Sequence, residues 1–196
     1  MKRILFITKK MIEITAENVI VLSQAIKLLN YPSNEISKED KNILRNLYGV
    51  VDGVIFQLYS RISSENISKK EKKKYYFQVK PLIMNVLNFS YKKEKIFLYG
   101  MTAHHLIELL NEVIYFDPVD VLNMALTTIE LSKSLGYTAD SHAIPEVVRI
   151  VEILLADFRE KLTKNEVLIN LIKLLDIFSD TGWPEANNLV WRLDEI

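Results

Sequence analysis

Histidine side chains can move protons or bind a metal near neutral pH, so they are the first candidates for chemistry in this chain. The 196 residues contain three of them, His104, His105 and His142. Adjacent residues on a helix point about 100° apart, so His104 and His105 do not readily bind one ion. Glu108 lies four residues after His104, but the HExxH pattern of zinc enzymes is missing. We therefore expect no metal site and place His104 and His105 on the surface, at the start of a helix.

A second candidate site combines lysines with aromatic residues between positions 69 and 95, a mixture that suits phosphate contacts and base stacking. Its interaction candidates are Lys69, Lys70, Lys72, Lys73, Lys74, Tyr75, Tyr76, Lys80, Lys92, Lys93 and Lys95. The simpler interpretation is a solvated, lysine-rich helix start followed by Tyr75, Phe77 and Val79 in the core. Nucleic acid is disfavoured because the formal net charge is zero and the patch uses lysine, a point charge, rather than forked arginine. An acidic protein partner, or the acidic half of another copy, is the alternative occupant.

The two tryptophans, Trp183 and Trp191, flank and lie on the last predicted helix. Tryptophan is common among the residues that dominate binding energy at interfaces, so both are candidates for anchoring a partner. The alternative is that they pack within the core or at a helix end.

Sequence patterns of catalysis are missing from the chain. There is no GxxxxGK[ST] or GxGxxG loop to surround a phosphate and no GxSxG turn to present a nucleophile. The absence of cysteine excludes a disulfide scaffold, a thiolate zinc site and a cysteine nucleophile. We therefore predict a non-enzymatic protein without a cofactor.

Charge is divided unevenly along the chain. Residues 1–98 carry 18 Lys+Arg and 9 Asp+Glu, a net charge of +9, whereas residues 99–196 carry 7 and 16, a net charge of −9. A division of this kind can steer partners or orient the stacking of copies. The alternative is two solvated faces that happen to differ.

The residues that position these groups are expected to be helical. The chain is 49% hydrophobic but has only five glycines and five prolines, too few turn residues for a β-sandwich or barrel. Apolar spacing and capping residues predict helices near 15–29, 37–62, 68–89, 103–115, 118–135, 145–162, 166–179 and 184–195. Two short segments, 3–8 and 95–99, are rich in β-branched or aromatic residues and are expected to be helical or extended.

We expect an all-α protein built as an irregular helical bundle or an α-solenoid-like array of about eight antiparallel helices. It is predicted as a single helical domain over residues 1–196, with a subdivision into a basic half, 1–98, and an acidic helical-hairpin half, 99–196, as the alternative. Segment 145–162 has an apolar stripe typical of one continuous helix. Segment 166–179 is apolar around nearly its whole circumference, which predicts burial on all sides.

No membrane partner and a cytoplasmic location are expected. The basic start is followed by an apolar run too short for a signal peptide. The most apolar window, 47–59, is interrupted by Asp52 and Gln57 and falls short of the ~20 apolar residues of a membrane span.

The last 80 residues contain several short runs that occur together in one group of proteins. These are Gly136-Tyr137, Asp140-Ser141, Ala143-Ile144, 147–151, Leu155-Ala156-Asp157, Arg159-Glu160, 182–186 and 192–195. Segment 117–196 resembles the helical C-terminal region of large bacterial multidomain ATP-binding proteins, several of them associated with antiphage defence. The resemblance implies a helical-repeat appendage used for sensing or assembly beside an ATPase or effector domain. The ATPase motifs of such proteins are missing, so the resemblance carries over no functional residue.

These observations together predict a non-enzymatic helical module for protein interaction or assembly, with self-association or a protein partner. Under the resemblance it is the terminal portion of a larger bacterial NTPase or defence assembly. The alternative is a nucleic-acid-binding helical protein that uses the basic and aromatic residues in segments 69–80 and 92–95. A small enzyme with its site beside His104 or His105 is the third hypothesis.

Overall fold

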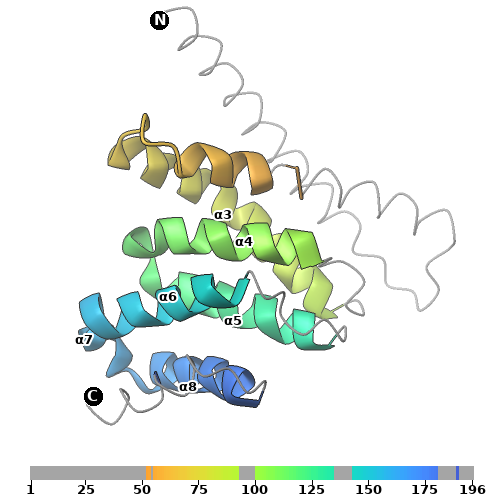
Figure 1. Ribbon diagram of the computed structural model, residues 1–196, viewed down its shortest axis with the longest axis vertical. Coiled ribbons are helices and arrows are strands. Elements are labelled where there is room, and N and C mark those ends of the chain that lie inside the picture. The colour runs from red at the N-terminus through yellow and green to blue at the C-terminus, as the bar shows by residue number, and fades with distance from the viewer. Residues whose placement is uncertain (1–51, 54, 93–99, 135–142, 181–188, 190–196) are drawn as a thin grey trace, which may run out of the picture.

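The computed structural model describes residues 52–53, 55–92, 100–134, 143–180 and 189, and every regular element in these ranges is helical (Figure 1). Helical residues 55–62 come first in the continuous part. The elements that follow are α3 (Lys69–Lys92), α4 (Gly100–Val113), the 3-10 turn η1 (Ile114–Phe116), α5 (Pro118–Ser134), α6 (Ala143–Asp157), α7 (Arg159–Leu162) and α8 (Asn165–Asp180). The prediction of an all-α protein is confirmed. The segments predicted at 3–8, 15–29, 95–99 and most of 184–195 lie outside the described residues.

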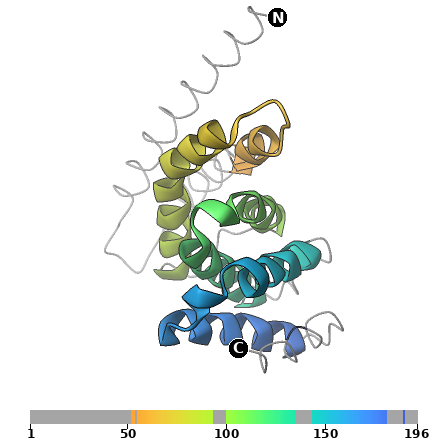
Figure 2. The same cartoon turned by 90° about the vertical axis from the view of Figure 1, so that its left-hand side faces the viewer.

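The described helices are packed in successive layers. Figure 1 shows α4, then α5 with α6, then α8, following one another along the long axis of the molecule. After a quarter turn, α3 runs along one side of these layers, whereas α8 lies across their end (Figure 2). The outer surfaces of α3 and α8 therefore lie on different sides of the molecule.

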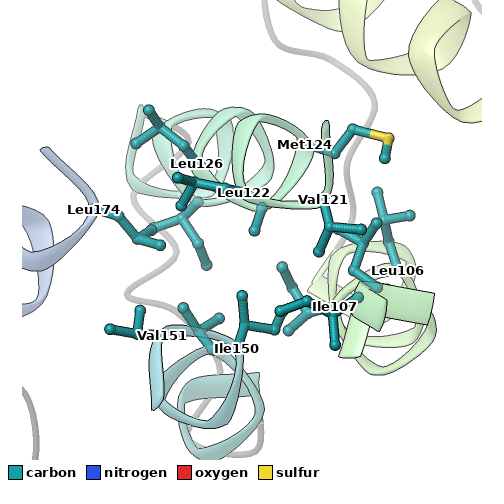
Figure 3. Packing of buried hydrophobic residues seen from close by; sticks show 14 of the residues in the cluster. Leu106, Ile107, Val121, Leu122, Met124, Leu126, Ile150, Val151 and Leu174 are labelled. Atoms are coloured by element: carbon teal, nitrogen blue, oxygen red, sulfur yellow. The ribbon is translucent and has the colours of Figure 1, made fainter. Parts of the chain in front are cut away.

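Helix α4 lies at the centre of the hydrophobic core. Its residues Leu106, Ile107, Leu109 and Leu110 have no exposed surface, so its apolar side chains cover more than one face. This is possible because α4 packs against α5, α6 and α3. Side chains of α5 and α6 meet those of α4 in the close view of the core, which labels Val121 and Leu122 of α5 and Ile150 and Val151 of α6 (Figure 3).

Helix α3 buries Val79 as predicted, but Phe77 is exposed. Its core residues are Tyr76, Val79, Ile83 and Leu87, spaced by three and four. The expectation that Phe77 lies in the core was wrong, because a residue next to Tyr76 on a helix points about 100° away from it.

Helix α3 begins with a reciprocal cap. The backbone N–H and the hydroxyl of Ser68 donate to Oε2 of Glu71 over 3.2 and 2.7 Å, and the backbone N–H of Glu71 donates to Oγ of Ser68 over 3.3 Å. The predicted start of this helix at Ser68 is therefore confirmed to within one residue.

The change Ser68→Ala is expected to lower the free energy of unfolding by about 1 kcal/mol, because it removes the side-chain acceptor for an unpaired N–H at the helix start. Urea unfolding followed by circular dichroism measures the change. The matched control is Ser68→Asp, which keeps an acceptor at the cap and is expected to stay near the wild-type value. Equal losses in both variants would contradict the capping role.

Two predictions for the later helices need correction. The helix expected at 145–162 is interrupted at Phe158, whose backbone angles of −128° and 24° are not helical. The interruption is held by tertiary contacts that a local pattern does not reveal: the Phe158 ring lies 5.9 Å from the Tyr115 ring, and the Tyr115 hydroxyl donates to Asp157 over 2.9 Å. Helix α8 is not buried on all sides either, since Ile169 and Ile172 are 50% and 40% exposed.

Candidate protein-docking surface

The predicted lysine patch begins in the first turns of α3. Lys69, Lys70, Lys73 and Lys74 are exposed there. A helix carries partial positive charge at its N-terminal end, so lysine is electrostatically unfavourable in the first turn. Glu71 is the one acidic residue in that turn. These lysines therefore work against the stability of their own helix.

Two other lysines of the patch face the protein. Nζ of Lys72 lies 3.7 Å from Oε2 of Glu112 on α4. Lys80 is 17% exposed and donates to Asp117 over 2.5 Å and to Asp120 at the start of α5. The basic and acidic segments thus attract each other within the molecule, and Lys72 and Lys80 are largely removed from the candidate surface.

Tyr76 belongs to the same internal network. Its side chain has no exposed surface, and its hydroxyl donates to Oδ2 of Asp117 over 3.3 Å. Burial raises the pKa of Tyr76, and the charges of Asp117 and Asp120 raise it further. Burial lowers the pKa of Lys80, but its hydrogen bonds to the two aspartates outweigh this effect, and the net pKa is raised. Tyr76 therefore cannot serve as a stacking residue, and Tyr75 is half-buried against the core.

The exposed side of α3 continues from lysine into apolar residues. Phe77 and Met84 are 43% and 40% exposed, and the exposed Pro81 lies between them at spacings of four and three. Lys73 and Lys80 place their Nζ atoms 5.9 and 5.8 Å from the centre of the Phe77 ring. Attraction between cation and ring holds the lysines beside this apolar surface. We define the α3 face as the row Lys70, Lys73, Lys74, Phe77, Pro81 and Met84.

Pro81 is an unusual residue for the middle of α3. Proline has no N–H to donate to the carbonyl of Phe77, and it costs about 3 kcal/mol in a helix interior. Figure 2 shows α3 changing direction along its length. The α3 face thus has two features that disfavour its helix, lysines at the start and a proline within.

The prediction that His104 and His105 lie on the surface was wrong. Both side chains are mostly buried, and their rings lie 5.7 Å apart. Nδ1 of His105 lies 3.3 Å from Oδ1 of Asp52, whereas Nε2 of His104 lies 3.6 Å from Oε1 of Glu108. Each histidine therefore faces its own carboxylate. Within the described ranges, no three His, Cys, Asp or Glu side chains are grouped to hold a metal ion.

A polar cluster continues from these histidines along α4. Glu108 accepts a hydrogen bond from Tyr59, and burial together with Glu108, Glu112 and Glu146 raises the pKa of that hydroxyl. The buried side chain of Asn111 donates to Glu146 on α6. These contacts join residues 55–62, α4 and α6, and the cluster therefore serves the packing of the core.

Charged residues of both signs occur within the described part of the acidic half. Along α6, α7 and α8, acidic and basic residues alternate at short intervals: Glu146, Arg149, Glu152, Asp157, Arg159, Glu160, Lys161, Lys164, Glu166, Lys173, Asp176 and Asp180. Acidic residues without such interleaving are found on α4 and at the start of α5, where Glu112, Asp117 and Asp120 contact α3. Part of the difference in charge between the two halves is therefore taken up by ion pairs inside the fold.

Several predicted interaction residues cannot be placed. Lys93, Lys95, Trp183 and Trp191 lie outside the described residues, as does His142. Lys92 is the last residue of α3.

Sequence reasoning missed the apolar part of the α3 face. Phe77 was placed in the core, and Met84 was not singled out. The signal that finds them is the helical period: the face of Lys70, Lys73 and Lys74 continues through positions 77, 81 and 84. The exposed pair on α8, Ile169 and Ile172, was missed as well, although the charged residues Glu166, Lys173 and Asp176 lie three or four positions from the pair and mark a solvent face.

Comparisons with protein-family models, with curated proteins and with solved structures find no match to this chain. The resemblance to bacterial multidomain ATP-binding proteins therefore stays a prediction. No helix within the described ranges is long and apolar enough to span a membrane.

Proposed function

We propose that this chain is a helical protein-interaction module that binds an acidic, amphipathic surface of a partner protein through its α3 face. The observation that supports this most is the junction of exposed lysines with exposed Phe77 and Met84 along one side of a single helix. Positive charge attracts an acidic partner, and the apolar row gives it a surface to bury.

Nucleic acid is the second candidate, supported by the lysines beside Phe77. Phosphate contacts require cations spread along the ligand, whereas the exposed lysines of the α3 face occupy only its N-terminal half. Pro81 and Met84 offer no hydrogen-bond donor to a phosphate or a base edge. The α3 face therefore suits an acidic helix better than a nucleic-acid strand.

A direct test uses a fluorescein-labelled acidic peptide of about 16 residues, with leucines on one helical face and glutamates beside them. We expect the full chain to bind it at low salt, with affinity falling as salt rises, and the double variant K70E/K73E to reduce the affinity at least about tenfold. The same variant is expected not to lower Tm, because it removes positive charge near the start of a helix. If Lys70 and Lys73 served only to stabilise the fold, the double variant would lower Tm.

The matched control is R159E/K164E, which changes the net charge equally at exposed residues away from α3. It is expected to bind like the wild type. A scrambled peptide, with its leucines spread around the helix, separates apolar docking from simple charge attraction. Failure to bind the amphipathic peptide would overturn the proposal. Salt-dependent binding of a labelled oligonucleotide that K70E/K73E abolishes, with no peptide binding, would establish the nucleic-acid alternative.

A further inference from the structure

The outer face of α8, like the α3 face, combines exposed apolar residues with charged residues. Its charge is mainly negative, whereas that of the α3 face is positive. Ile169 and Ile172 are exposed large apolar residues, and Asp176 follows them at a spacing of four. Asp180 and Glu166 are also exposed and lie at the two ends of this row. We define the α8 face as Ile169, Ile172, Asp176 and Asp180. Its two aspartates lie toward the C-terminus of α8, whereas the lysines of the α3 face lie toward the N-terminus of α3.

We infer that the α8 face of a second copy is the partner of the α3 face, so that copies of this chain join α3 to α8. The inference rests on the proposed function, of which it names the partner. It follows from the order of residues along the two helices, which match when the helices run antiparallel.

The register can be checked from the helical rise of about 1.5 Å per residue. With Lys74 opposite Asp176, seven residues lead from Lys74 to Pro81 and seven from Asp176 back to Ile169, about 10.5 Å on each helix. On the other side of the pair, four residues separate Lys74 from Lys70 and Asp176 from Asp180. The two lysines thus face the two aspartates over about 6 Å, and the apolar residues of both helices follow on the other side of the Lys74–Asp176 pair.

The apolar rows overlap in the same register. Phe77 lies three residues from Lys74, and Ile172 lies four residues from Asp176, so the ring and the isoleucine come within one residue of each other along the pair. Contact between them would remove two exposed apolar side chains from water. Lys173, the one basic residue of α8, lies opposite Phe77 in this register; its charge repels the lysines of the α3 face and lowers the attraction.

A single molecule cannot make this contact with itself. Helix α3 runs along one side of the layers and α8 lies across their end (Figure 2). The pairing therefore joins two different surfaces of two copies, leaving one free α3 face and one free α8 face at the ends. Such an interface continues into a ring or a filament, according to the rotation between successive copies.

The test is sedimentation equilibrium of the full chain over a range of concentrations. We expect the mean mass to rise with concentration at about 0.05 M salt and to fall at about 0.5 M. Lys74→Asp and Asp176→Lys alone are each expected to weaken association at least about tenfold. In a mixture of these two variants every junction between unlike copies has opposite charges, either the new aspartate at position 74 with the new lysine at position 176 or Lys74 with Asp176. The mixture is therefore expected to assemble again with the two variants alternating. The double variant K74D/D176K is expected to assemble again.

Lys173→Glu is the complementary variant and is expected to strengthen association. Far-ultraviolet circular dichroism and Tm establish that each variant is folded. A wild-type chain that stays monomeric at all concentrations would overturn the inference. So would a mixture of the two single variants that associates no better than either variant alone while both are folded. Because the acidic-peptide experiment does not involve α8, binding there without self-association leaves the proposed function standing with a different partner.

Discussion

Tyr76→Ala is expected to lower the free energy of unfolding by about 3–5 kcal/mol, the usual cost of removing a buried aromatic ring. The ring of Tyr76 has no exposed surface and belongs to the core cluster of α3, α4 and α5. Removing it leaves a cavity and takes from Asp117 a hydrogen bond made across two helices. Urea unfolding followed by circular dichroism measures the loss.

Phe77→Ala is the matched control for this prediction. The neighbouring ring is 43% exposed, so its removal is expected to cost less than about 1 kcal/mol. Equal costs for Tyr76→Ala and Phe77→Ala would contradict the helical register on which the α3 face depends. A folded Phe77→Ala variant also serves the binding experiments, because its loss of affinity then reports on the surface alone.

Lys80→Met is expected to lower the free energy of unfolding by about 2 kcal/mol, less than a fully buried ion pair because the groups are partly exposed. Lys80 neutralises both Asp117 and Asp120, and its loss leaves the two carboxylates beside each other without a cation. The exposed Lys73 provides the control, since Lys73→Met breaks no such network and is expected to be nearly neutral. Similar stability of the Lys80 and Lys73 variants would contradict the structural role of this network.

The same network predicts a loss of stability at alkaline pH. Tyr76 and Lys80 both have a raised pKa in the folded chain, so the folded state holds these protons more tightly than the unfolded state. Their contribution is complete below about pH 10, the ordinary pKa of tyrosine, and is lost as pH rises above it. In urea titrations at increasing pH, Tyr76→Phe and Lys80→Met are expected to show a smaller decline than the wild type. If the free energy of unfolding of both variants fell with pH as steeply as that of the wild type, other groups would be the cause of the fall.

Local patterns were sufficient to predict most helices of the described region. The proline and capping residues placed the start of α5 at Pro118, and Ser68 placed the start of α3 to within one residue. These signals act between neighbours in the chain, so the sequence contains them in full. The interruption at Phe158 was missed because it depends on Tyr115, a residue 43 positions away.

The candidate site was predicted only in part. The exposed lysines of α3 were found from composition. Which of them face the interior was not, because even adjacent lysines of this helix have different neighbours. Lys72 and Lys80 turn to acidic residues of α4 and α5, whereas Lys73 and Lys74 face solvent. Distant segments therefore decide which lysines are available to a partner.

The amino-acid sequence by itself determined that the chain is helical, where α3 and α5 begin, and which stretch is rich in lysine, since each of these depends on residues close together in the chain. Tertiary structure alone decided that Tyr76 is buried and Phe77 exposed, that α4 is enclosed, and that α8 leaves Ile169 and Ile172 in solvent. The physical reason is that the helical period defines which residues share a face of a helix, but not which other helix packs against that face. Burial and ion pairing are assigned to a face only when a second helix packs against it.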